Sequence, residues 1–426
     1  MMSEIKEIKN ELLNDSYYEI DHSSGYKIFV YPKENYSSAY AVFGTKYGSI
    51  DTCFKVEGQE QFTEVPEGIA HFLEHKLFES EELDAFARYA KTGASANAYT
   101  SFDKTCYLFS CTDNFEDSLE ILFDFVQNPY FTEQTVQKEQ GIIGQEIRMY
   151  EDEPGWESLF VMLRAMYHNH PVRIDIAGTV ESISHISADL LYECYNTFYN
   201  PANMALAVAG NVTVEQVLKI ADKMLKPRES KEVERKFQKE PATVIEKTAV
   251  KNLSVSMPIF AIGFKEDIKT PCRTLKESIE SNILLDIIAG KTSPLYEKLL
   301  NEGLINTTFE TEYFEGYGYS AHIFSGESNN YEKVREYINE ELSKVIKDGV
   351  DKEAFDRIKK KHYGNFIMNF NDIDSIANSL VGEYFNGDGL FDQLSVLESI
   401  TLEDVNSRIR NAINIENSSM SVIKQK

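Results

Sequence analysis

The feature that most constrains the fold of this chain is a repeat, because one pattern of strand and helix signals occurs in both halves. Phe109 corresponds to Phe324, 215 positions later, and Thr135 corresponds to Ala354, 219 positions later. The paired segments are YLFS at 107–110 with AHIFS at 321–325, NFE at 114–116 with NYE at 330–332, and YFTEQTV at 130–136 with GVDKEAF at 349–355. We interpret this self-similarity as two copies of one domain of roughly 210 residues. A chance likeness between two strand–helix stretches is the alternative.

Helix and strand signals are interleaved along the chain, which predicts an α+β fold built from two pseudo-symmetric repeats. Helices are predicted over 68–79, 115–126, 132–150 and 188–198, and strands over 26–31, 38–47, 96–100, 105–111 and 204–209. Residues 226–246 differ, since basic and acidic side chains alternate there and few apolar residues occur. We interpret them as a charged linker between an N-terminal domain, 1–225, and a C-terminal domain, 247–426. A run of charges is also typical of a solvated face.

Composition excludes some classes of partner. The chain of 426 residues carries 43 basic and 69 acidic side chains, which gives a formal net charge of −26. This argues against nucleic acid and anionic membrane surfaces as partners, and it favours basic ligands. No apolar run approaches the roughly 18 residues of a membrane-spanning helix, and the N-terminal residues MMSEIK do not form an apolar signal segment. Five cysteines without a CxxC pair leave an odd thiol, which predicts a reducing cytoplasm.

The chemistry of the chain is concentrated in the segment HFLEH at residues 71–75. In a helix, His71 and His75 lie about 40° apart around the axis and one turn apart along it. Two imidazoles in this arrangement can bind one small cation, and Zn²⁺ takes such nitrogen ligands. Glu74 is rotated off their shared line, so it can reach a water on the metal without being a ligand. The alternative is a pair of packed or solvated histidines beside an ordinary surface glutamate.

A catalytic zinc site uses three protein ligands and one open position, so one ligand must come from elsewhere in the chain. The predicted helix 132–150 offers Glu133, Glu139 and Glu146. Glu139 and Glu146 are seven residues apart, or two turns, and therefore share a face. One of them can bind the metal while the other holds a ligand or a water in place. A solvated acidic face is the alternative.

A second histidine pair, His168 and His170, lies just before Pro171. Because no cluster of carboxylates or thiols surrounds this pair in the sequence, we interpret the segment as a surface turn.

Together the motifs resemble the pitrilysin (M16) family of zinc peptidases, the inverzincins, in which HxxEH is followed by Glu-x6-Glu. Here these are residues 71–75 with Glu139 and Glu146. The likeness extends through GASANAYT at 93–100, Gly178-Thr179, Asn203-Met204 and GNV at 210–212. With the second half it covers nearly the whole chain, and it is nearest to a short bacterial cytosolic branch with two domains per chain.

The resemblance implies roles for individual residues. His71, His75 and Glu146 would be the zinc ligands, Glu74 the general base, and Glu139 the carboxylate behind the ligands. It also implies the family fold, a pair of pseudo-symmetric α+β domains that forms one half of a clamshell around a peptide-sized chamber. Substrates of the family bind by adding a strand to a sheet edge. In this chain the edge would be formed by Ser95, Ala96, Asn97 and Ala98.

One departure from the family concerns an Arg and a Tyr that stabilise the oxyanion near a motif of the form L-R-E-x-x-G-L-x-Y. The matching segment here is LLNEGLIN at 299–306, with Asn301 where Arg is expected and Asn306 near the place of Tyr. Three tyrosines follow, at positions 313, 317 and 319, without a neighbouring Arg in the sequence. We therefore expect a heterodimer in which a paralogous subunit supplies the pair, with a homodimer as the alternative.

The leading hypothesis is a cytoplasmic zinc endopeptidase for unfolded peptides, with a preference for basic ones because of the acidic surplus. Glu74 would take the proton of the water and pass it to the leaving amine. A second hypothesis keeps the fold without catalysis, as a peptide-binding or structural subunit. A third is the maturation of one specific peptide.

Overall fold

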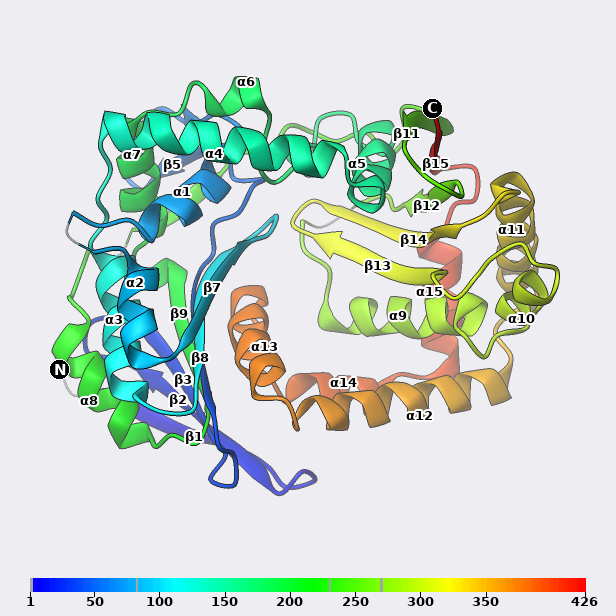
Figure 1. Cartoon of the computed structure of the whole chain (residues 1–426). Coiled ribbons are helices and arrows are strands. Elements are labelled where there is room, and N and C mark those ends of the chain that lie inside the picture. Colours follow the sequence, from blue (N-terminus) through cyan, green and yellow to red (C-terminus); the bar gives the residue numbers. More distant parts are fainter. Residues whose placement is uncertain (1–2, 82, 230, 269–270) are drawn as a thin grey trace. The chain divides into compact units, whose positions relative to one another are not determined.

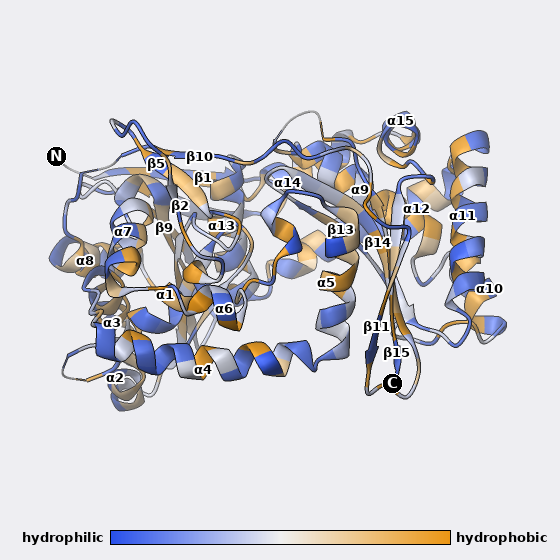
Figure 2. Ribbon diagram, turned by 90° about the horizontal axis from the view of Figure 1, so that it is seen from above, coloured by the Kyte–Doolittle hydropathy of each residue, from blue (hydrophilic) through white to orange (hydrophobic). Residues whose placement is uncertain are grey.

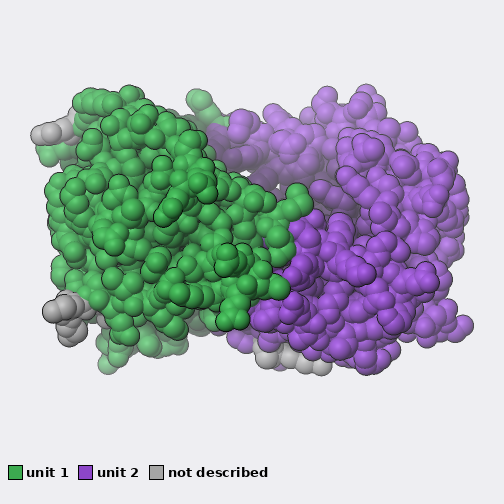
Figure 3. All heavy atoms as spheres, turned by 90° about the horizontal axis from the view of Figure 1, so that it is seen from below, with its two compact units in different colours: residues 1–145, 175–236, 367–391 green, residues 146–174, 237–366, 392–426 purple. Residues whose placement is uncertain are grey.

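The computed structural model describes residues 3–426 except 82, 230, 269 and 270. The chain forms two compact units, each assembled from three segments. Unit 1 contains residues 1–145, 175–236 and 367–391, and unit 2 contains 146–174, 237–366 and 392–426 (Figure 3). Both units therefore include residues from both halves of the sequence. The boundaries of the two sequence repeats, at 225 and 247, remain a prediction.

Unit 1 is built on a seven-stranded sheet, here called sheet A, with the order β1-β2-β3-β9-β4-β8-β7. Its strands are β1 (Glu4–Asn10), β2 (Asp15–Asp21), β3 (Lys27–Pro32), β4 (Ala39–Thr45), β7 (Ser95–Thr100), β8 (Thr105–Cys111) and β9 (Met204–Gly210). Every residue of β4 and β9 is buried. This explains their continuous apolar sequences, because central strands covered on both faces lose the alternation of half-buried strands.

Helices cover both faces of sheet A. Figure 1 shows α3 and α13 on opposite sides of it. The helices of this unit are α1 (Ile69–Leu77), α2 (Ala85–Thr92), α3 (Phe115–Gln127), α4 (Glu133–Glu151, which continues past the unit boundary), α6 (Val180–Ile183), α7 (Ala188–Phe198), α8 (Val214–Met224), α13 (Ile373–Asn386) and the 3-10 turn η2 (Pro201–Asn203). A small sheet joins β5 (Cys53–Val56), β6 (Thr63–Glu64) and β10 (Val233–Arg235). The last strand lies within the segment interpreted as a linker.

Unit 2 contains a five-stranded sheet, here called sheet C, with the order β11-β15-β12-β14-β13. Its strands are β11 (Thr248–Leu253), β12 (Ile259–Lys265), β13 (Glu310–Gly316), β14 (Tyr319–Glu327) and β15 (Ser418–Gln425). Its helices are α5 (Pro154–Met166), α9 (Leu275–Ala289), α10 (Pro294–Asn301), α11 (Tyr331–Asp348), α12 (Lys352–Asn369), α14 (Asp392–Ser399), α15 (Leu402–Ala412) and the 3-10 turn η1 (Pro171–Arg173). A cluster of buried aliphatic and aromatic side chains from α9, α11, α15 and the strands forms its core.

The two sheets share one topology, which confirms the predicted pair of α+β repeats. In sheet A the order β3-β9-β4-β8-β7 has one parallel pair, β3 with β9, followed by antiparallel pairs. In sheet C the order β11-β15-β12-β14-β13 has the same sequence of pairings, with β11 and β15 parallel. After β8 come α3 and α4, and after β14 come α11 and α12. The segments paired in the sequence are therefore structurally equivalent.

Each sheet is covered on one face by a helix from the other half of the chain. Helix α13 lies against β4 and β9 of sheet A, and α5 lies against β12 and β15 of sheet C. A glycine allows each contact. A Cβ at Gly44 of β4 would lie 2.7 Å from Cγ1 of Val381 on α13, and a Cβ at Gly263 of β12 would lie 2.2 Å from Cε of Met166 on α5.

The predicted elements of the first half agree with the structure to within two residues at most ends, since helical and strand periodicities are local properties. The largest differences are at 38–47, where β4 covers only Ala39–Thr45, and at 68–79, where α1 covers only Ile69–Leu77. Figure 2 shows α4 with alternating hydrophilic and hydrophobic turns, as expected for a helix with one buried face. Among the described residues, no helix combines the length and the apolar character needed to cross a membrane.

Candidate metal centre

Helix α1 carries the HxxEH segment, and its start is fixed by a close backbone contact. Gly68, the residue before the helix, has φ = 85°, and a Cβ there would lie 2.3 Å from the backbone oxygen of Ala177. Gly178 lies in the loop that faces Gly68 and has φ = 74°. A Cβ at Gly178 would lie 2.6 Å from the backbone oxygen of Glu67. Only glycine fits both positions. The Gly178-Thr179 motif therefore holds the beginning of α1 against the segment that follows α5.

The two histidines of α1 converge as the helical spacing predicts. Their ring centroids lie 4.6 Å apart. His71 is only 8% exposed, whereas His75 is half-buried. Burial, together with the nearby His75, lowers the pKa of His71 from 6.5 to about 3. The imidazole of His71 is therefore neutral at physiological pH, which is the form that binds a metal.

The helix α4 places its two carboxylates differently. Glu146 joins His71 and His75, and the candidate ligand atoms of these three residues all lie within 4.8 Å of one another. Glu139 is buried instead, and its Oε1 lies 3.0 Å from Nδ1 of His75. Such a carboxylate orients the imidazole and leaves Nε2 for the metal. Glu133 lies elsewhere, with its Oε1 accepting a hydrogen bond from the backbone N–H of Ala188.

Glu74 lies next to this cluster in the sequence and is also buried, at 8% exposure. Its Oε2 accepts a hydrogen bond of 2.6 Å from the hydroxyl of Thr100, the last residue of β7. Thr100 was not among the site residues predicted from the sequence. Its only sequence signal is its position at the end of GASANAYT, 26 residues from Glu74 along the chain.

The donor set of the cluster fits zinc. Two imidazoles and one carboxylate from two helices, with a buried carboxylate behind one imidazole, are the ligand types and the supporting contact that catalytic zinc sites use. Among the residues that the structure describes, this cluster is the only group of three or more His, Cys, Asp and Glu arranged to hold a metal.

Two family matches cover most of the chain. Residues 60–180 match the Insulinase family (peptidase family M16), and residues 185–361 match the peptidase M16 inactive domain. The uncharacterized zinc protease YmfH of Bacillus subtilis is 44% identical over 416 residues, which cover 96% of this chain and 96% of that protein.

This chain belongs to the M16 peptidase family.

Solved M16 structures agree with this membership. An M16-like protein from Alicyclobacillus acidocaldarius matches with a TM-score of 0.91 and 34% identity, covering 100% of this chain and 99% of that one. Pitrilysin, at 16% identity and a TM-score of 0.76, shares the fold over 99% of this chain and 46% of its own. The resemblance inferred from the motifs is therefore confirmed, and so is the two-repeat M16 fold.

The strand proposed to receive substrate in this M16 chain is an edge of its sheet. In the described part of the chain, β7 pairs with β8 alone. Ser95 and Asn97 are exposed, whereas Ala96 and Ala98 are half-buried. At its end β7 is held from both faces, since Thr100 bonds Glu74 of α1 and the hydroxyl of Tyr99 donates to Oδ1 of Asn378 on α13 at 2.9 Å.

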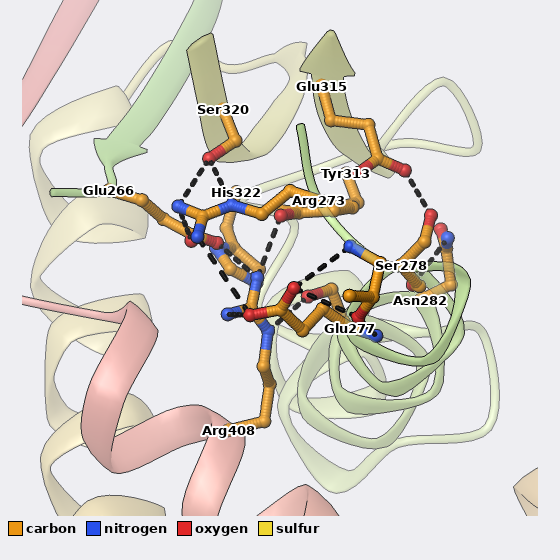
Figure 4. A network of polar contacts seen from close by, with 12 residues as sticks. Glu266, Arg273, Glu277, Ser278, Asn282, Tyr313, Glu315, Ser320, His322 and Arg408 are labelled. Carbon is orange, nitrogen blue, oxygen red and sulfur yellow. Dashed lines mark hydrogen bonds and ion pairs between the residues drawn. The ribbon is translucent and has the colours of Figure 1, made fainter. Parts of the chain in front are cut away.

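The second M16 repeat contains a buried ionic network beside α9 (Figure 4). Helix α9 lies against β13 as α1 lies against β7. Arg408 of α15 donates to Glu266 at 2.7 Å, to the hydroxyl of Tyr313 at 2.7 Å and to Ser281 of α9 at 2.8 Å. Arg273 forms a second ion pair with Glu266 at 2.6 Å.

His322 of β14 is enclosed by this network. Burial and the two arginines lower its pKa well below 6.5, so it is neutral.

Asn306, near the expected position of the family's Tyr, is engaged within unit 2. Nδ2 of Asn306 donates to Glu327 at 2.7 Å, and its Oδ1 accepts from the backbone N–H of Thr308 at 2.9 Å. Asn301 is the last residue of α10. Tyr313 and Tyr319 are buried at 7% and 3% exposure, whereas Tyr317 is 38% exposed. The fold does bring arginines to Tyr313, which the sequence did not show, but Arg408 is itself buried and paired with Glu266.

In the segment interpreted as a surface turn, Asn169 is exposed and His168 is half-buried, but the side chain of His170 is not on the surface. His170 is 1% exposed, and its ring stacks on Phe237 with centroids 5.3 Å apart. Its Nδ1 accepts from the N–H of Val172, so its Nε2 carries the proton and donates to the oxygen of Tyr317 at 3.0 Å. Two bonds and a stacked ring explain why a polar side chain is stable there.

Proposed function

We propose that this chain is a zinc-dependent endopeptidase that hydrolyses unfolded peptides. The observation that carries the proposal is the convergence of His71, His75 and Glu146 within 4.8 Å of one another. Glu74 adjoins this cluster on α1, and Glu139 contacts His75. Relatives named as zinc proteases support it, among them YmfH and YmxG of Bacillus subtilis.

Each site residue would have a separate role in catalysis. His71, His75 and Glu146 would hold the metal, and Glu139 would fix the ring of His75. When bound, zinc acts as a Lewis acid toward water and toward the scissile carbonyl. Glu74 would take the proton that the water loses and deliver it to the leaving nitrogen. The outer edge of β7, at Ser95–Ala98, would hold the peptide extended by main-chain hydrogen bonds, which place little demand on its sequence.

Several finer points belong to the same proposal. We place the enzyme in the cytoplasm, acting on peptides of net positive charge because of the overall charge of −26. We propose a heterodimer with a paralogous subunit that supplies Arg and Tyr. One relative is named as the beta subunit of the mitochondrial-processing peptidase of Caenorhabditis elegans, and it is 32% identical over 174 residues.

Replacement of Glu74 by Gln separates binding of the metal from chemistry. The amide keeps the size of the side chain but cannot accept the proton, so turnover should fall by about 10²–10⁴-fold while zinc per chain stays unchanged. Elemental analysis and a fluorogenic peptide assay, each on the parent and the E74Q chain, measure both quantities. Near-normal turnover of the variant would remove Glu74 from the mechanism. A parent chain that never retains zinc would instead favour a structural, non-catalytic subunit.

A further inference from the structure

We infer that Thr100 is a positioning residue for Glu74, an inference that rests on the proposed peptidase function. The hydroxyl of Thr100 donates to Oε2 of Glu74 at 2.6 Å. This distance is in the range of hydrogen bonds to an ionised carboxylate. Glu74 is 8% exposed, and a buried carboxylate is stable only with such donors. The bond therefore fixes which way the carboxylate of Glu74 is turned.

The neighbouring hydroxyl of Thr105 does not compete with Glu74 for the proton of Thr100. Oγ1 of Thr105 lies 3.4 Å from Oγ1 of Thr100. Thr105 donates its own proton to the backbone oxygen of Tyr47 at 2.9 Å. Because a hydroxyl has one proton, Thr105 can only accept from Thr100, and at a much longer distance than Glu74 does. The proton of Thr100 is thus committed to Glu74.

The bond ties the carboxylate of Glu74 to the end of β7. Oε2 accepts from the hydroxyl of Thr100, so a residue of the strand sets the orientation of the carboxylate. Without the hydroxyl this restraint is lost, so fewer bound substrates meet the base in the productive geometry.

Thr100 also connects the base to the strand that would bind substrate. It is the last residue of β7, and β7 begins with the proposed peptide edge at Ser95. Tyr99, the residue before it, points to the opposite face and bonds Asn378. One strand therefore sets the position of both the extended peptide and the carboxylate of Glu74.

The first experiment measures kinetics with Thr100→Val and Thr100→Ser. The Val variant keeps the shape but has no hydroxyl, so kcat should fall by about 10–100-fold, as for other partners of active-site groups, while KM changes less than about twofold. The Ser variant restores the donor and should recover most of the kcat. Thr105→Val is the matched control, because it removes a buried hydroxyl from the same corner without touching Glu74. It should lower thermal stability and leave kcat unchanged.

The second experiment does not depend on activity. A double-mutant cycle combines Thr100→Val with Glu74→Met, and the melting temperature of each zinc-free full-length chain is measured. If the hydroxyl serves the carboxylate, Thr100→Val lowers the melting temperature of the parent more than that of the Glu74→Met chain.

The outcomes are distinguishable. Additive melting temperatures, or a Thr100→Val enzyme with parental kcat, would overturn the inference. So would equal losses in the Val and Ser variants. A parent chain that shows no peptidase activity, either alone or mixed with a paralogue that carries Arg and Tyr, would contradict the proposed function. The thermal cycle would still decide whether Thr100 holds Glu74.

Discussion

At the scale of single residues, the candidate site combines a neutral, buried histidine, His71, with carboxylates in unequal surroundings. His71 is kept neutral by burial, which lowers its pKa to about 3. Glu139 and Glu146 share a face of α4, yet only Glu146 belongs to the cluster with both histidines. Oε1 of Glu139 is hydrogen-bonded to Nδ1 of His75. We therefore expect replacement of Glu139 and replacement of Glu146 to reduce metal affinity by different amounts.

Replacement of Glu146 by Gln should remove zinc, because a neutral amide is a poor ligand and only two protein ligands remain. Replacement of Glu139 by Gln should weaken zinc binding by about 10–100-fold, since the ring of His75 keeps a hydrogen-bond acceptor but loses the charge. Competition with a chelator of known affinity measures both. A larger loss with Glu139→Gln than with Glu146→Gln would reverse the assignment.

Because His170 is buried, we expect the free energy of unfolding to depend on pH, whether or not a metal is bound. Burial lowers its pKa from 6.5 to about 4. Between these values the unfolded chain binds a proton that the folded chain does not. The free energy of unfolding should therefore decrease as the pH falls from about 6.5 to about 4, by up to about 3 kcal/mol from this residue.

Urea denaturation at pH 7 and pH 5 tests this prediction. His170→Asn keeps an acceptor for the N–H of Val172 but does not titrate, so its stability should change less between the two pH values than that of the parent. His185→Asn is the control, because His185 is exposed and meets water in both states. The same pH dependence in the parent and in His170→Asn would contradict the argument.

At the scale of elements, the glycines of central strands decide how closely a helix can approach a sheet. Gly44 lies in the fully buried strand β4, beneath Val381 and Phe385 of α13. Gly263 has the same relation to Met162 and Met166 of α5. A methionine side chain can move away from an added methyl group, whereas a valine on a packed helix cannot rotate as freely. The contact at Gly44 is therefore the less tolerant of the two.

We predict that Gly44→Ala destabilises the protein by about 1–3 kcal/mol through overpacking against α13. Gly382→Ala provides the matched control on the helix itself, because a Cβ there meets nothing within 4 Å. That variant should be neutral or should stabilise by up to about 1 kcal/mol, as alanine does in a helix. Chemical denaturation of the zinc-free chains gives both values. A stable Gly44→Ala chain would show that α13 can shift away from the sheet.

At the scale of the whole molecule, the proposed peptidase needs a donor that stabilises the developing oxyanion. Asn306 is engaged by Glu327 and Thr308, and Arg408 is paired with Glu266 inside unit 2. None of these groups is arranged as a donor for a developing oxyanion. Loss of one such donor typically reduces kcat by about 10²–10³-fold.

The chain alone, loaded with zinc, should therefore hydrolyse peptides poorly, and a paralogue that carries Arg and Tyr should restore turnover when the two are mixed. A fluorogenic peptide assay of each chain and of the mixture tests this. Strong activity of this chain alone, abolished in E74Q, would place the donor within it. The exposed Tyr317 would then be the first residue to replace, because Tyr313 and Tyr319 are buried.

Local patterns in the sequence were sufficient for the fold class and for the helix that carries the two candidate histidine ligands. The spacing of His71 and His75 depends only on the geometry of one helical turn, and the repeat depends on matching segments of β8–α3 and β14–α11. Each of these is a relation between residues that are near in the sequence or that recur in the second half after similar intervals, 215 and 219 positions. The geometry and periodicity of single helices and strands determine these patterns.

Only the tertiary structure decided which residues from different elements meet. Helical spacing left Glu139 and Glu146 interchangeable, and the packing of α4 against α1 separated them. Thr100 meets Glu74, and Arg408 meets Tyr313, although 26 and 95 positions separate the partners in the sequence. The placement of α13 on sheet A and of α5 on sheet C likewise combines distant segments into one unit. Such contacts depend on how whole faces fit together, and that fit involves side-chain volumes from many elements at once.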